Sequence, residues 1–221
     1  MTFSRRTPYY MSMNILELLD GKWTDGTRPK DIYEFYISKN PSDYVKAIIE
    51  GLSSEKRKVQ SGSAELASLL SKNNPELIYP HINLFIDNLD AEAPVLRWEA
   101  VCTLGNLTKA DKNGIIPAYI DHIVPFLSNK SIVLQGHSVR ALSKIAETNP
   151  KEAPRILDRL LESREFFPEN RIGFIIEEMK TFLHHEKLKN TVKNLVKPYL
   201  KSDIKSVSRK AKKILKTIEA S

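Results

Sequence analysis

The feature that most constrains this chain is an apolar pattern that returns every 36 to 38 residues. In the stretch LRWEAVCTLGNL, residues Leu96, Ala100, Leu104 and Leu107 stand at positions +0, +4, +8 and +11, which lie on one face of an α-helix. A near-constant period of this length predicts one helical unit that is repeated five times. The four other copies are Val59, Ser63, Ala67 and Leu70; Leu134, Ser138, Leu142 and Ile145; Arg171, Ile175, Met179 and Phe182; and Val207, Ala211, Leu215 and Ile218.

A second amphipathic stretch precedes each of these helices, and Pro or Asn-Pro sequences mark the joints between them. Each pair therefore predicts a helical hairpin whose second helix carries the apolar stripe. No segment alternates apolar and polar residues over a length that makes a strand, so the predicted fold class is all-α. The predicted helices run over about 42–52 and 55–72, 76–89 and 94–109, 115–127 and 132–148, 152–161 and 169–184, and 188–200 and 204–219.

The first 41 residues do not share the repeat pattern. A loose arm is expected over residues 1–11. Two short helices are predicted behind it, one from the N-cap candidate Ser12 to Leu19 and one that begins at Pro29. We expect the segment 1–41 to cap the apolar face of the first repeat. The repeat array is then predicted over 42–221, with units at about 42–73, 74–110, 111–149, 150–185 and 186–221.

The clearest copy of the pattern also carries a family resemblance. Its second helix reads aliphatic-Arg-x-x-Ala-x-x-x-Leu-Gly-x-Leu, which resembles the HEAT repeat of the armadillo-like α-solenoid family. The resemblance implies a right-handed α-solenoid of about five helical hairpins, and it covers about 42–221. All six marked positions match in one copy, at Leu96, Arg97, Ala100, Leu104, Gly105 and Leu107, whereas the other copies have Gln60, Gln135, Ile172 and Ser208 in the place of Arg97.

The resemblance further implies that the second helices line a concave surface, so candidate binding positions lie opposite the stripe. The groove formed by these positions has mixed charge, whereas binding of duplex nucleic acid through many phosphates favours a uniformly basic track. The sequence therefore indicates a non-enzymatic scaffold whose expected partner is a protein. The candidate partner-binding residues are Trp98, Glu99, Asn106, His137, Arg140 and Lys144.

Two of the residues in the clearest copy have a structural interpretation beside a functional one. An arginine at the position of Arg97 usually bonds an acid of the preceding helix or turn, so the predicted acceptor is Asp87, Asp90 or Glu92. Trp98 can anchor a partner, but packing against the neighbouring unit is favoured.

Positive charge is concentrated at the C-terminal end of the sequence. The net charge is +7, but the last 35 residues hold eleven Lys or Arg and two acidic residues, so this end carries +9 and the rest −2. Two interpretations stay open: a solubilising end of the array, or a surface for an anionic partner such as nucleic acid, an acidic protein or a lipid surface. The candidate anion-binding residues are Arg209, Lys210, Lys213 and Lys216.

Enzymatic interpretations find little support in the residues. The sequence His184-His185-Glu186 lacks the i, i+4 spacing that puts two metal ligands on one helix face. The alkylpurine DNA glycosylases, which are built from similar repeats, carry a Trp-Asp-x-x-Asp-like stretch whose last Asp is catalytic. Here that stretch begins at Trp98 and has Cys102 in place of the carboxylate. We therefore expect neither enzymatic activity nor a metal or other cofactor. The alternative that stays open is nucleic-acid binding through the basic C-terminal repeat, as a plain binder or as a degenerate relative of these glycosylases.

The expected compartment is the cytoplasm. Cys102 is the only cysteine, which excludes an intramolecular disulfide and suits a reducing environment. No apolar run approaches the ~20 residues of a membrane span, and no apolar run follows Arg5 and Arg6 to make a signal peptide.

Overall fold

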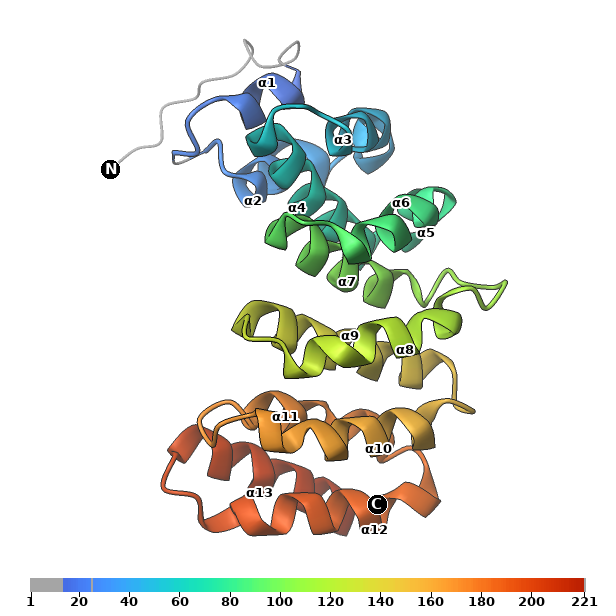
Figure 1. The fold of residues 1–221 in the computed structure, drawn as a ribbon, viewed down its shortest axis with the longest axis vertical. Helices are drawn as coiled ribbons and strands as arrows, with labels where there is room; N and C mark the ends of the chain where they lie inside the picture. The colour runs from blue at the N-terminus through green and yellow to red at the C-terminus, as the bar shows by residue number, and fades with distance from the viewer. Residues whose placement is uncertain (1–13, 25, 221) are drawn as a thin grey trace. The chain divides into compact units, whose positions relative to one another are not determined.

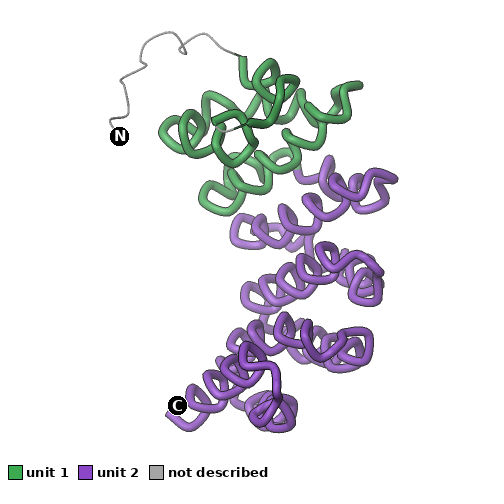
Figure 2. Tube along the Cα trace, turned by 90° about the vertical axis from the view of Figure 1, so that its left-hand side faces the viewer, with its two compact units in different colours: residues 1–81 green, residues 82–221 purple. Residues whose placement is uncertain are grey.

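The computed structural model describes residues 14–24 and 26–220, and the predicted arm and Ser12 lie outside them. The described residues form two compact units, within 1–81 and within 82–221 (Figure 2). All regular elements of the described chain are helical, in agreement with the predicted class. The α-helices are α1 (Ile15–Asp20), α2 (Pro29–Ile32), α3 (Val45–Leu52), α4 (Arg57–Asn73), α5 (Pro75–Ile78), α6 (Ile82–Asp87), α7 (Pro94–Leu107), α8 (Ile120–Ile123), α9 (Ile132–Thr148), α10 (Ala153–Ser163), α11 (Gly173–Phe182), α12 (Glu186–Val196) and α13 (Lys205–Glu219).

Short 3-10 or π-helical turns adjoin many of these helices. Continuous first helices were predicted for the second, third and fifth hairpins, and the structure corrects this. Pro80, Pro117, Pro125 and Pro198 lie within the 3-10 turns, because a proline has no N–H with which to continue the α-helical bonding. The 3-10 turns are Pro41–Tyr44, Tyr79–His81, Asn88–Asp90, Ile116–Tyr119, Val124–Ser128, Arg164–Phe166 and Lys197–Lys201, and the π-helical turn is Tyr33–Ile37.

In the N-terminal unit, α1 and α2 pack against the hairpin of α3 and α4. Helix α1 begins after Asn14, whose side-chain oxygen accepts a hydrogen bond of 3.0 Å from the N–H of Leu16. It ends at Asp20, one residue after the predicted end at Leu19, and Gly21 follows as its C-cap. Ile15 and Leu19 of α1 are buried. The role of residues 1–41 as a cap, and the repeat boundaries, stay predictions.

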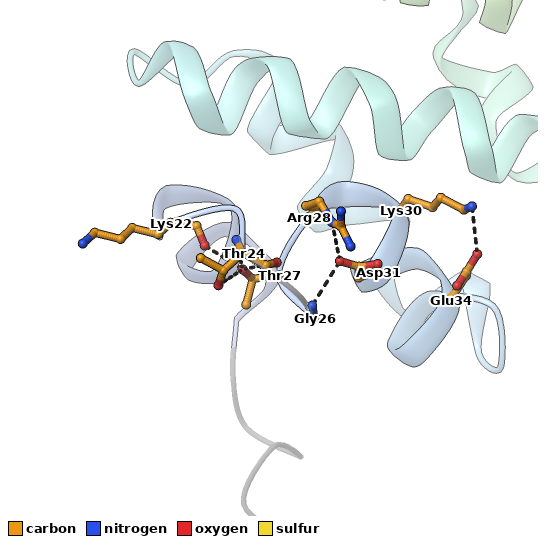
Figure 3. A network of polar contacts seen from close by, with 8 residues as sticks. All are labelled: Lys22, Thr24, Gly26, Thr27, Arg28, Lys30, Asp31 and Glu34. Atoms are coloured by element: carbon orange, nitrogen blue, oxygen red, sulfur yellow. Dashed lines mark hydrogen bonds and ion pairs between the residues drawn. The ribbon is translucent and has the colours of Figure 1, made fainter. Parts of the chain in front are cut away.

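Side chains fix the turn that joins α1 to α2 (Figure 3). The hydroxyl of Thr27 donates to the carbonyl of Lys22 at 2.6 Å. One carboxylate oxygen of Asp31 accepts from the N–H of Gly26 at 3.1 Å and from Nε of Arg28 at 2.9 Å. The hydrogen bond from Arg28 lowers the pKa of Asp31 below its usual value. Gly26 has a φ of 88°, a backbone conformation that residues other than glycine rarely adopt.

In the C-terminal unit, the second helices of successive hairpins stack on one another. Helix α7 contacts α9, α9 contacts α11, and α11 contacts α13 (Figure 1). The first helices α8, α10 and α12 contact α9 and α11, in part through their adjoining 3-10 turns. The predicted stripes of α7 and α9 are fully buried, whereas Leu215 and Ile218 of α13 are only half-buried. Hydrophobic burial between neighbouring hairpins therefore holds this unit together.

Helices α7 and α9 approach each other closely at Gly105. A Cβ added at Gly105 would lie 2.8 Å from the Cα and 2.9 Å from the Cβ of Ala141. Only glycine leaves room for the Ala141 backbone at that distance. The glycine of the repeat pattern is thus required by packing between hairpins.

Arg97 makes a structural bond at the start of α7, but its acceptor differs from the predicted one. Its Nε and Nη2 donate to the main-chain carbonyl of Ala91, at 3.1 and 2.6 Å. The predicted acceptors Asp87, Asp90 and Glu92 were wrong. The physical reason is that the turn before α7 points a free carbonyl at the guanidinium, and a helix end needs partners for such groups.

Candidate binding face

The solvent-facing side chains of α7, α9, α11 and α13 form one surface of the C-terminal unit, which we call the second-helix face. Four of the predicted residues are accessible on it: Glu99 is half-buried on α7, and His137, Arg140 and Lys144 are half-buried or exposed on α9. Trp98 is also half-buried, and its Nε1 donates to Oε1 of Glu99 at 3.2 Å.

Asn106 differs from the expectation that it faces solvent. Its residue is only 7% exposed, and its Oδ1 accepts a hydrogen bond from Nζ of Lys144. The long side chain of Lys144 reaches from α9 to α7 and covers the shorter amide. These two predicted residues therefore link adjacent hairpins, and Lys144 carries the exposed part of the pair.

Two further contacts link adjacent second helices. The guanidinium carbon of Arg140 lies 5.9 Å from the ring centroid of Phe174 on α11, within the range of a cation–π contact. Nζ of Lys210 on α13 lies 2.7 Å from Oε2 of Glu177 and donates to the carbonyl of Gly173 at 3.3 Å. The second-helix face is thus crossed at each step by a polar or cation–π contact.

Burial and charge perturb the protonation of two groups on this face. Burial, together with the positive charges of Arg140 and Lys144, lowers the pKa of His137 to about 4. The imidazole is therefore neutral near pH 7 and offers one hydrogen-bond donor and one acceptor. Burial raises the pKa of Glu178, although Lys180 and Arg140 oppose that shift. Sequence reasoning missed Glu178, because it directly precedes Met179 of the apolar stripe and so does not lie opposite that stripe.

Of the four candidate anion-binding residues on α13, three line one pocket and the fourth does not. A pocket of about 360 Å³ between α11 and α13 is lined by Arg209, Lys210 and Lys213, but not by Lys216. Lys180 of α11 lines the same pocket. Sequence reasoning missed Lys180, since it falls at +9 of its stripe, next to the apolar position of Met179 at +8. Its proximity to α13 depends on how the hairpins stack.

The residues considered for enzymatic chemistry remain scattered. Cys102 is half-buried on α7, and His184 and His185 precede α12. Within residues 14–24 and 26–220, no group of three or more His, Cys, Asp or Glu is placed to hold a metal ion. In the same described part of the chain, no helix combines the length and apolarity needed to cross a membrane.

Comparison with solved structures relates the arrangement to helical repeat proteins. No family model matches the chain, and no curated protein matches it. The designed armadillo repeat protein YIII(Dq)4CqI superposes with a TM-score of 0.61 at 14% identity, covering 92% of this chain and 98% of that one. An engineered protein, Northeast Structural Genomics Consortium target OR329, gives a TM-score of 0.55 at 16% identity, covering 94% and 97%.

A second engineered protein, target OR366 of the same consortium, gives a TM-score of 0.58 at 16% identity and covers 95% of this chain and 100% of that chain. Identities at this level relate the folds alone. Together with the stacked helical hairpins, they show that the chain has the HEAT/armadillo-like helical repeat fold, an α-solenoid.

Proposed function

We propose that this chain is a non-enzymatic helical repeat scaffold that binds a protein partner through the second-helix face. The observation that carries the proposal is the row of contacts between neighbouring second helices: Lys144 with Asn106, Arg140 with Phe174, and Lys210 with Glu177. These contacts hold charged and aromatic groups in place before a partner arrives. Binding then costs less side-chain entropy than it would with free side chains.

The chemistry of the face suits a protein better than a nucleic acid. Arg140 and Lys144 stand beside the neutral imidazole of His137 and the carboxylates of Glu177 and Glu178. Mixed charge gives specificity toward a complementary protein surface, whereas a strand of phosphates favours cations alone. The chain's one cysteine also suits the reducing cytoplasm as the place of that interaction.

The alternative, nucleic-acid binding through the basic C-terminal repeat, predicts a different response to salt. Its cations lie on both helices of the last hairpin, including Lys193 on α12 and Arg209 and Lys216 on α13. Several phosphate contacts would make affinity fall steeply between about 50 and 200 mM salt. A protein partner held by mixed charge should respond weakly over the same range.

The proposal is tested by Arg140→Glu on the full-length chain, with Arg159→Glu as the control. Arg159 is an exposed arginine on the first helix α10, so both variants make the same change of charge. A partner captured from the host is identified and purified, and its Kd is measured by calorimetry. We expect Arg140→Glu to weaken binding about tenfold or more and Arg159→Glu to leave it within about twofold. Equal affinity of the wild type and Arg140→Glu would show that the face is wrongly assigned.

A further inference from the structure

The pocket between α11 and α13 has an excess of positive charge that the protein does not neutralise. Four cations line it, Lys180, Arg209, Lys210 and Lys213, against the single carboxylate of Glu177. Lys210 bonds Glu177 at 2.7 Å, and this hydrogen bond lowers the pKa of the carboxylate, so the pair is ionised and mutually neutralised. The pocket therefore holds a surplus of three positive charges.

The three surplus cations are available to a ligand. Lys180, Arg209 and Lys213 are exposed, and none has an ion-pair partner among the residues that the structure describes. The floor includes Ile214, which is only 5% exposed. Like charges gathered around an apolar floor repel one another, so an anion in the pocket relieves that repulsion.

A neighbouring pocket limits what kind of anion fits. A second hollow of about 470 Å³ shares the lining residues Lys180 and Thr217 with the first, so the two lie side by side. It is lined further by Glu147, His184 and the largely buried Leu183. The site therefore offers one strongly positive position followed by a position with an apolar side chain and a carboxylate.

A positive pocket beside a hollow of mixed character suits a peptide that carries one doubly charged group. A phosphate monoester carries close to two negative charges and three acceptor oxygens, which suit an Arg fork and Lys ammonium groups. A nucleic-acid strand that continued into the neighbouring hollow would bring its next phosphate towards Glu147. Lys193 and Lys197, which would extend a basic track, lie on and directly after α12, the first helix of the hairpin.

We propose that the pocket formed by Lys180, Arg209 and Lys213 binds a phosphorylated serine or threonine side chain of a protein partner, whose flanking residues occupy the neighbouring hollow. This inference rests on the proposed function, because it assumes that the partner is a protein. It adds the chemical class of the group that the C-terminal end of the second-helix face binds, a phosphate monoester.

The test uses the full-length chain and fluorescence anisotropy at about 150 mM salt, where exposed charges are well screened. The probes are a fluorescein-labelled degenerate peptide library with a fixed central phosphoserine, the same library with serine, and a single-stranded DNA 20-mer. The pocket variant is Lys180→Gln/Arg209→Gln/Lys213→Gln. The control variant is Lys193→Gln/Lys197→Gln/Lys201→Gln, which removes three positive charges from the last hairpin, outside the pocket.

We expect the phosphoserine library to bind about tenfold or more tightly than the serine library. The pocket variant should lose this preference, and the control variant should keep it within about threefold. Titration with O-phosphoserine, followed by amide NMR, should shift residues of α11 and α13 in the wild type and leave them unchanged in the pocket variant.

Three results would overturn the inference: equal binding of the two libraries, equal losses in both variants, or DNA bound more tightly than the phosphoserine library. Its failure can be told apart from failure of the proposed function. If Arg140→Glu abolishes capture of the protein partner while the phosphoserine and serine libraries bind equally, only the proposal of a phosphate site is refuted. If phosphoserine binds as expected while Arg140→Glu leaves capture unchanged, the pocket stands and the wider face is wrongly assigned.

Discussion

Substitution of Gly105 by alanine should destabilise the C-terminal unit, although alanine is the better helix former. In a helix interior, Gly→Ala ordinarily stabilises by about 1 kcal/mol. Here the new Cβ would lie 2.8 Å from the Cα of Ala141, and ordinary contact begins at 3.4 Å. The obstacle is backbone and cannot rotate away, so α7 and α9 must separate by about 0.6 Å, which already forfeits a quarter or more of the contact energy along the interface.

Overpacking of this kind costs about 1–3 kcal/mol, and here it acts between two helices that pack against each other. The obstacle is backbone, so we place the packing cost in the upper part of that range, at about 2–3 kcal/mol, and expect Gly105→Ala to lower the free energy of unfolding by about 1–2 kcal/mol after the helix-forming gain of about 1 kcal/mol is subtracted. The assay is urea denaturation followed by circular dichroism at 222 nm, with comparison of the midpoints. Midpoints are the safer measure, because repeat proteins can depart from two-state unfolding.

Gly136→Ala is the matched control. Gly136 lies within α9, and a Cβ added there would meet only the ring of Phe174, at the ordinary contact distance of 3.8 Å. This variant should raise stability by about 0.5–1 kcal/mol through helix propensity alone. A Gly105→Ala midpoint equal to or above that of the wild type would refute the close approach of α7 and α9.

Two other perturbations give measurable effects. Arg97→Met removes both donors to the carbonyl of Ala91 and should cost about 1–3 kcal/mol in urea denaturation, with Arg97→Lys in between; an unchanged midpoint would contradict the structural role of the bond. For His137 the pKa is about 4 in the folded chain and 6.5 in the unfolded chain. Between pH 6.5 and pH 4 the unfolded chain therefore binds a proton at this residue that the folded chain does not, and the free energy of unfolding falls as the pH drops through this range. The wild type should lose about 1–2 kcal/mol over this range relative to His137→Gln, less than the full shift implies because the ring is only partly buried; parallel pH profiles would refute the environment assigned to His137.

The fold was predictable because its determinants are local in the sequence. The period of 3.6 residues and the proline joints predicted a helix over 132–148, and α9 runs from Ile132 to Thr148. The candidate site was less predictable, because its contacts join helices from different repeats. Lys144 and Asn106 are 38 residues apart, and Lys210 and Glu177 are 33 apart. No pattern within one helix specifies how its neighbour is offset along the stack, so the residues of a face could be named but not their partners.

The position of Arg97 shows how a repeat preserves an interaction while its sequence changes. In four of the five hairpins, a side chain near the start of the second helix donates to a carbonyl at the end of the first helix, where such groups need partners. Arginine is one solution, but any side chain with a donor of suitable length serves, so a pattern that requires arginine understates the repeat. The fourth copy has Ile172, which has no side-chain donor, and it is also the copy whose stripe begins with the half-buried Arg171 outside the helix. The equivalent bonds run from Gln60 to the carbonyl of Leu52 at 3.1 Å, from Gln135 to that of Leu127 at 3.0 Å, and from Ser208 to that of Leu200 at 2.7 Å.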